Sequence, residues 1–144
     1  MRGRASAAVA LLIAGIALSG CTEVESDTVE GYEPAHLQEI EGSELKRVTF
    51  TREGAARTDL RSEPVQRSGG RRAVSYAALI YDGDGKTYVY VADKPLSFMR
   101  AEVVIDRIEG ARALLRDGPP VGSQVVTTGA AEVHGAELEI AGSH

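Results

Sequence analysis

Residues 76–91 read YAALIYDGDGKTYVYV and give the clearest indication of the fold. In this stretch, Asp82-Gly83-Asp84-Gly85 separates two runs that are rich in β-branched and aromatic residues. Such runs favour strands, and Asp-Gly pairs are typical of the tight turns that connect antiparallel strands. The stretch therefore predicts a β-hairpin whose strands cover residues 73–81 and 86–92.

Similar short segments flank the hairpin on both sides, separated by turns that contain Gly or Pro. Strands that recur about every ten residues are typical of antiparallel sandwiches, rolls and barrels. We expect a mostly β fold over residues 44–144, as a small antiparallel β-roll or barrel-like domain. The other expected strands are residues 45–50, 61–66, 98–107, 111–116, 124–128 and 136–140.

One short helix is expected after the first of these strands. Thr51 can cap a helix, Glu53 is acidic in the first turn, and an alanine pair follows. These features predict a helix that ends near Asp59. A single helical turn is also expected over residues 129–132, before the last strand.

The N-terminus has the composition of an export signal. Arg2 and Arg4 precede an apolar run from Ala5 to Leu18. This run is shorter than the roughly 20 residues that a membrane-spanning helix needs. Residues 1–20 are therefore predicted to be a signal peptide.

The stretch Leu18-Ser19-Gly20-Cys21 resembles the lipobox of bacterial lipoproteins. In that family the cysteine begins the mature chain, and its thiol carries a diacylglycerol. The resemblance implies that Cys21 is the lipid attachment site, where acyl chains such as palmitate hold the protein on the extracytoplasmic face of a bacterial membrane. The alternative interpretation is a core cysteine that follows an ordinary helix.

Residues 21–43 are rich in acidic residues and poor in large apolar ones. Such a segment repels itself and cannot bury enough surface to fold alone. We expect a flexible tether between the lipid anchor and the domain. Within it, residues 36–40 are a candidate edge strand.

The charge balance also limits the partners. The chain has 16 Lys and Arg against 21 Asp and Glu, a net charge of −5 at pH 7. Nucleic acid is not an expected partner, because binding it requires a basic surface. Anionic headgroups would repel this chain, so we expect the acyl chains to provide the attachment to the bilayer.

The Asp82–Gly85 turn does not match a calcium-binding EF-hand loop. A loop that began at Asp82 would have Lys86 where it needs an acid or amide, and Thr87 where it needs glycine. A plain hairpin turn explains these residues.

The three histidines, His36, His134 and His144, are widely separated. The best candidate metal cluster is His134 with Glu132 and Glu137, for which a solvated loop histidine is the simpler interpretation. We expect neither a metal nor another cofactor.

No segment has the pattern of a catalytic site. Ser75, Ser97 and Ser123 have no histidine near them in sequence, and no nucleophile-elbow or phosphate-binding motif is present. We therefore expect that the protein is not an enzyme.

Four tyrosines gather around the hairpin and are candidates for a partner contact: Tyr76, Tyr81, Tyr88 and Tyr90. Cross-strand packing in the core is one interpretation, and an exposed protein-contact patch is the other. Arg71 and Arg72 likewise belong either to a solvated loop or to a contact with lipid headgroups.

Most of the chain after residue 47 resembles the membrane-proximal domain of periplasmic adaptor proteins, the membrane fusion subunits of resistance-nodulation-division efflux pumps. The segments that carry the resemblance are residues 48–65, 76–91, 99–105, 114–118 and 121–137. In full-length adaptors the first of these segments and the later ones come from opposite ends of the chain. Here only a glycine-rich loop separates them, and no heptad run long enough for a coiled-coil hairpin exists.

The resemblance implies a short lipoprotein form that keeps only the membrane-proximal domain. Its function would be that of a binding or accessory subunit, associated with an efflux-type membrane transporter or another envelope protein. The alternative is a receptor lipoprotein that binds a solute or a metal.

Overall fold

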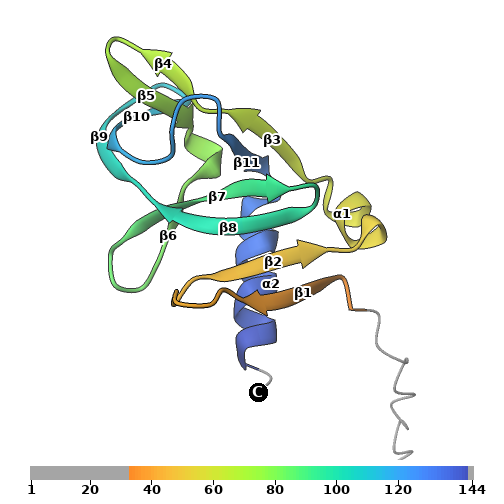
Figure 1. Cartoon of the computed structure of the whole chain (residues 1–144). Helices are drawn as coiled ribbons and strands as arrows, with labels where there is room; N and C mark the ends of the chain where they lie inside the picture. Colours follow the sequence, from red (N-terminus) through yellow and green to blue (C-terminus); the bar gives the residue numbers. More distant parts are fainter. Residues whose placement is uncertain (1–32, 143–144) are drawn as a thin grey trace, which may run out of the picture. The chain divides into compact units, whose positions relative to one another are not determined.

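The computed structural model describes residues 33–142, which form two antiparallel β-sheets and three helical segments (Figure 1). The larger sheet has the order β1-β2-β8-β7-β11-β3, with β6 beside β7. Its strands are β1 (Ala35–Glu39), β2 (Lys46–Phe50), β3 (Arg61–Pro64), β6 (Ile80–Tyr81), β7 (Thr87–Lys94), β8 (Ser97–Glu102) and β11 (Gln124–Thr128).

The smaller sheet has the order β4-β5-β10-β9. Its strands are β4 (Gln66–Ser68), β5 (Arg71–Ser75), β9 (Val104–Glu109) and β10 (Arg112–Asp117). The helices are α1 (Arg52–Thr58), the single-turn 3₁₀ helix η1 (Tyr76–Ala78) and α2 (Ala130–Gly142). The mostly β, antiparallel fold is therefore as predicted. Among the described residues neither sheet closes into a barrel, because the pairing of each ends at two edge strands.

Several predicted elements lie outside or at the border of these residues. The predicted signal peptide, Cys21 and His144 fall outside the described part of the chain. Strand β1 lies within residues 21–43, for which a tether is predicted, and it pairs antiparallel with β2. The folded part of the chain therefore begins before residue 44, and the candidate edge strand is present at one edge of the larger sheet.

The predicted hairpin turn forms as its sequence indicates. Ile80 pairs with Tyr88, and Tyr81 with Thr87. The Asp82 carboxylate accepts hydrogen bonds from the backbone N–H of Asp84 and Lys86, at 3.0 and 2.8 Å. These bonds occupy the carboxylate within the turn itself.

Helix α1 also follows its local signals. The Thr51 hydroxyl accepts a hydrogen bond from the Gly54 N–H at 3.0 Å, which satisfies a donor that the first helical turn leaves free. The helix ends at Asp59, whose backbone adopts the left-handed conformation.

Two of the expected strands are instead divided between the two sheets. Residues 61–66 split at Val65, and residues 98–107 split at Val103. Both valines are buried in the core between the sheets. The Val65 N–H donates to the Ser123 carbonyl, and the Val103 N–H to the Thr87 carbonyl, so their donors remain paired outside the regular ladders.

A third crossing corrects the prediction of one strand over residues 73–81. The chain leaves β5 at Ser75, forms η1, and enters the larger sheet at Ile80. The buried Ala78 and Leu79 pack into the core at this crossing. The run is therefore apolar because its side chains enter the core, although part of it is not a strand.

The C-terminal segment also differs from its prediction. Residues 130–142 form one helix, α2, where a single turn and then a strand over residues 136–140 are expected. Ala130, Val133 and Glu137 are buried, at the spacing of one helix face. Packing of this face against the larger sheet stabilises the helix.

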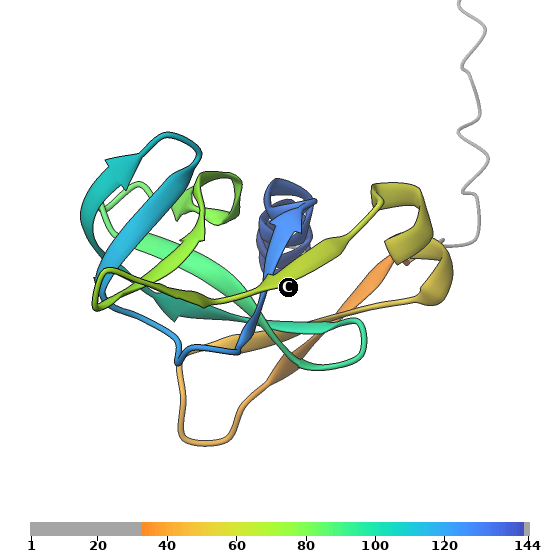
Figure 2. The same cartoon turned by 90° about the horizontal axis from the view of Figure 1, so that it is seen from above.

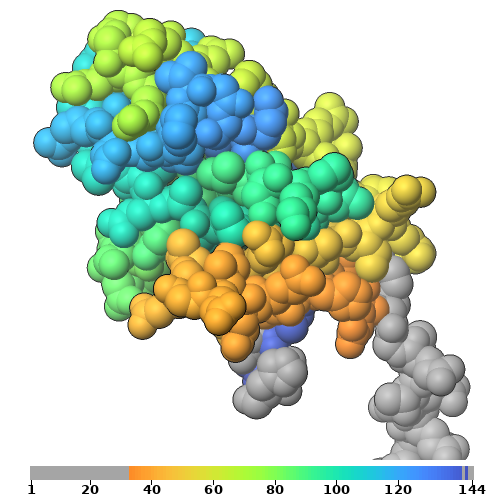
Figure 3. Space-filling view, viewed as in Figure 1, coloured from red at the N-terminus to blue at the C-terminus, as the bar shows by residue number. Residues whose placement is uncertain are grey.

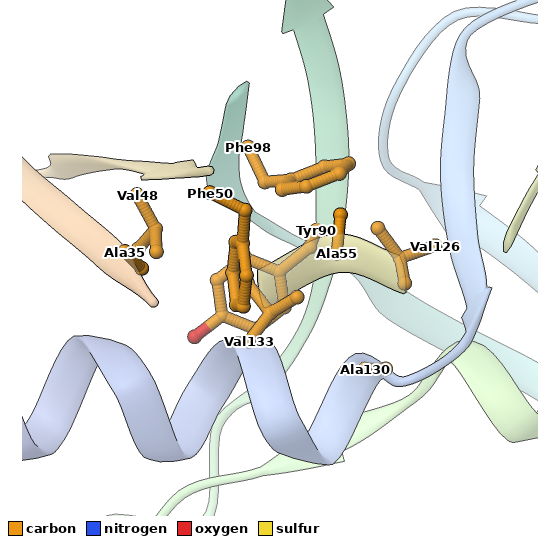
Figure 4. Packing of buried hydrophobic residues seen from close by; sticks show 9 residues of the cluster. All are labelled: Ala35, Val48, Phe50, Ala55, Tyr90, Phe98, Val126, Ala130 and Val133. Carbon is orange, nitrogen blue, oxygen red and sulfur yellow. The ribbon is translucent and has the colours of Figure 1, made fainter. Parts of the chain in front are cut away.

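The domain has two hydrophobic cores. The first, the helix-side core, packs residues of the larger sheet against α1 and α2, and Phe50 and Phe98 meet edge to face with ring centroids 6.2 Å apart (Figure 4). The second, the intersheet core, contains aliphatic residues of both sheets. Seen from above, the smaller sheet and α1 lie on opposite sides of α2 (Figure 2).

Candidate functional site

The four predicted contact tyrosines separate into an exposed pair and an inner pair. Tyr76 is 48% exposed and Tyr81 is 54% exposed. Tyr88 is half-buried, and Tyr90 is fully buried, at 0% exposed. Of the four tyrosines, only Tyr76 and Tyr81 are therefore about half exposed to solvent.

The exposed pair lies where the chain passes from η1 into β6. Partial burial raises the pKa of Tyr81, and a hydrogen bond with Tyr76 raises it further. The two phenols are therefore neighbours, although they are five positions apart in the sequence. Exposed tyrosines combine a large apolar ring with a polar tip and are enriched at protein interfaces.

Tyr88 is covered by a charged neighbour. The Arg100 guanidinium lies over its ring, 5.1 Å from the centroid, in a cation–π arrangement. Arg100 comes from β8, where it is the register partner of Tyr90. Tyr88 is therefore a cross-strand packing residue with a limited exposed edge.

Tyr90 follows the core-packing interpretation of the tyrosines and does not belong to an exposed contact patch. Its ring belongs to the helix-side core, and its hydroxyl oxygen points toward α2 (Figure 4). The hydroxyl donates to Glu137 Oε2 at 2.5 Å and lies 3.0 Å from His134 Nδ1. Burial and this hydrogen bond to the carboxylate raise the pKa of Tyr90 well above its ordinary range. The phenol is therefore a permanent donor at neutral pH.

Arg100 completes a polar cluster at the border of the helix-side core. Its Nε lies 3.1 Å from Oε1 of Glu137, whose side chain is 5% exposed. The two groups form an ion pair, but the N–H direction is wrong for a hydrogen bond, and Nε has no hydrogen-bond partner among the described residues. The polar cluster, defined here as Tyr90, Arg100, His134 and Glu137, joins β7 and β8 to α2.

The polar cluster was not predicted because the helix was not predicted. His134 and Glu137 are on one helix, where a solvated loop histidine and a strand glutamate are expected. The spacing of Ala130, Val133 and Glu137 was the available signal, but a glutamate on the apolar face of a helix obscures that pattern.

The polar cluster does not match a metal site or a covalent catalytic site. The described residues contain no group of three or more His, Cys, Asp and Glu side chains placed to hold a metal ion. Glu132 is exposed, and His36 pairs with Glu33 at 3.2 Å. The buried Ser97 hydroxyl lies 2.8 Å from that of Thr49 and not beside a histidine. The arrangement supports a structural role best, in which the polar cluster holds α2 on the larger sheet.

Comparison of the chain with protein-family models and with curated proteins gives no match. Within residues 33–142, none of the helices has the length and apolar character needed to cross a membrane. The resemblance to adaptor proteins therefore stays a prediction from the sequence.

Proposed function

We propose that the protein is a lipid-anchored binding subunit of the bacterial envelope that associates with an efflux-type membrane transporter. The acylated Cys21 would hold the domain on the extracytoplasmic face of the membrane, and the domain would contact its partner directly. The observation that carries the proposal is the exposed neighbouring pair Tyr76 and Tyr81.

The lipid anchor supports this function through concentration. Two acyl chains hold a protein stably at a bilayer, whereas one chain holds it only marginally. Confinement beside the membrane raises the effective concentration of the domain near any membrane partner, so a modest contact is sufficient. The exposed aromatic pair would provide such a contact.

The placement of the pair supports a rigid contact. Tyr76 follows the buried end of β5 and donates its backbone N–H to the Ala111 carbonyl at 2.8 Å. Tyr81 is in the β-ladder opposite Thr87. Since both backbones are fixed, binding would order few additional groups, and little conformational entropy would be lost.

Crosslinking in cells tests the proposal. A photoreactive phenylalanine analogue at position 76 or 81 of the full chain should crosslink to an integral membrane protein, which mass spectrometry would identify. The same analogue at position 138 is the control, because Leu138 on α2 is 56% exposed. Equal yields at all three positions would contradict the proposal.

A substitution measures the contribution of the pair. Tyr76→Ala with Tyr81→Ala should lower recovery of the partner in a detergent pull-down by about tenfold or more, since buried interface tyrosines often contribute more than 1 kcal/mol each. Leu138→Ala should leave recovery unchanged. Unaltered recovery with the double variant would remove the tyrosine pair from the interface.

A further inference from the structure

The smaller sheet carries an arginine-lined groove that neither the predicted anchor nor the tyrosine pair uses. The groove has a volume of about 530 Å³, within the usual range of ligand sites. Half of its eight lining residues are arginines: Arg67, Arg71, Arg72 and Arg116. These arginines come from β4, β5 and β10. Pro120 and Val121, in the segment that follows β10, also line the groove. Figure 3 shows the two contributing segments, in yellow-green and blue, side by side.

Two of these arginines oppose each other directly. Arg67 and Arg72 are register partners in the β4–β5 ladder, so their side chains lie on the same face of the sheet. Like charges in directly opposed positions destabilise a sheet. The chain therefore holds together two positive charges that repel each other, although its net charge is −5.

Neighbouring carboxylates neutralise only part of this charge. Arg72 pairs with the highly exposed Asp117 at 3.2 Å. Asp106 is shared by Arg71 at 3.5 Å, Arg116 at 3.8 Å and, outside the groove, Arg107 at 3.0 Å. Arg67 makes no ion pair with any residue that the structure describes. Two carboxylates therefore serve four groove arginines, and an excess of positive charge remains.

We propose that this groove binds a phosphate group. The planar guanidinium donates two parallel N–H bonds that match phosphate oxygens, and a phosphate between Arg67 and Arg72 would replace their repulsion by attraction. The apolar wall formed by Pro120 and the 44% exposed Val121 gives room for the organic part of a phosphate ester. The ester is either a phospholipid headgroup or a soluble phosphate. The proposal does not depend on the transporter partner.

The test uses the mature chain from residue 21 with Cys21→Ser, so that acyl chains do not contribute. Inorganic phosphate, titrated at constant ionic strength against chloride, should produce saturable shifts of the arginine Nε–H signals in NMR spectra. Phosphate should also raise the unfolding temperature, because it binds the folded state. Arg67→Gln with Arg72→Gln should weaken phosphate binding about tenfold or more, since each charge-assisted hydrogen bond contributes strongly.

The control removes the same charge elsewhere. Arg57→Gln with Arg61→Gln alters two exposed arginines, one in α1 and one at the start of β3, and should change phosphate affinity less than about twofold. Thermal unfolding without phosphate checks the groove variant, which should be about as stable as the wild type because it loses the opposed charges and, with them, only an exposed ion pair between Arg72 and Asp117. Absence of saturable phosphate binding by the wild type, or equal weakening in both variants, would overturn the proposal.

Vesicles distinguish the two sources of phosphate. Cosedimentation with vesicles that contain an anionic phospholipid, but not with purely zwitterionic ones, and its loss in the groove variant would identify a lipid headgroup. Phosphate binding without cosedimentation would identify a soluble phosphate ester. Cosedimentation that the groove variant retains would place lipid contact elsewhere and would refute a headgroup in the groove.

Discussion

The two hydrophobic cores share strands β7 and β11 but enclose different kinds of side chain. On one face of these strands, Tyr90 and Val126 belong to the helix-side core, together with Phe50 and Phe98. On the other face, Val89 and Val125 belong to the intersheet core, whose buried members are all aliphatic. The polar cluster lies at the border of the helix-side core, while the buried residues of the intersheet core carry no polar side chain.

This difference indicates how each interface is specified. An aliphatic core between two sheets gains stability roughly in proportion to its buried area, without a preferred direction for any one contact. A helix on a sheet can slide or rotate unless a directional contact fixes it, and the hydrogen bond from Tyr90 to Glu137 provides one. Since consecutive residues of β7 enter different cores, single substitutions can probe the two cores separately.

The largest effect is expected from truncating the intersheet core. Leu115→Ala removes a side chain that is 1% exposed and should lower the free energy of unfolding by about 2–5 kcal/mol, because it loses apolar burial and leaves a cavity. Urea unfolding followed by circular dichroism measures the change. Both sheets should unfold in one transition, since Val89 and Val125 join this core to the larger sheet.

The exposed Leu138 of α2 is the matched control for this truncation. Leu138→Ala should change the free energy of unfolding by no more than about 0.5 kcal/mol. Two separate transitions in Leu115→Ala, one for each sheet, would show that the two cores are less strongly joined than their shared strands indicate.

The sequence predicted those elements whose signals are local. The Asp82–Gly85 turn and the Thr51 cap depend on neighbouring residues only, and each forms where expected. The switch of a strand from one sheet to the other is not local. Val103 continues the alternation of Met99 and Ala101 through its switch, so nothing in that alternation marks the change of partner.

The candidate site was predicted in part for the same reason. Tyr76 and Tyr81 are only five positions apart, but Tyr76 lies in η1, outside the β6–β7 hairpin, so their proximity depends on a 3₁₀ turn that was not predicted. Glu137 can be buried because Tyr90 provides a hydrogen bond and Arg100 provides an ion pair, and these residues lie 47 and 37 positions earlier in the chain. A buried glutamate is unfavourable without such partners, and these partners are not visible until the fold is known. The lipid attachment at Cys21 stays a prediction.

A smaller effect is expected from removing the directional contact of the helix-side core. Tyr90→Phe keeps the ring and deletes the hydroxyl, which leaves the buried Glu137 with one donor fewer. We expect a loss of about 1.5–3 kcal/mol in the free energy of unfolding, the usual range for a hydrogen bond to a charged group. Chemical denaturation at pH 7 measures it, and Phe98→Leu, which changes packing but no polar group, is the control.

The same variant should alter the pH dependence of stability. The folded state keeps the Tyr90 proton above the ordinary pKa of 10.0, whereas the unfolded chain releases it. The stabilisation from this group is therefore complete below pH 10 and decreases as the pH rises above it, by about 1.4 kcal/mol per pH unit. Tyr90→Phe should lose this part of the alkaline decrease, while Leu115→Ala should retain it. Identical alkaline profiles for wild type and Tyr90→Phe would contradict a buried, protonated phenol.

The smallest effects are expected from two glycines, one directly before α2 and one in its middle. Gly129 joins β11 to α2 with φ at +82°, and a methyl group there would approach the Thr58 carbonyl and the Leu60 side chain. Gly129→Ala should therefore cost about 1–2 kcal/mol, the usual cost of a left-handed backbone for other residues. Gly135 has a helical backbone and open space around it, so Gly135→Ala should stabilise by about 0.5–1 kcal/mol. Thermal unfolding of both variants measures this contrast. A gain from Gly129→Ala would show that α2 can begin without the left-handed backbone at position 129.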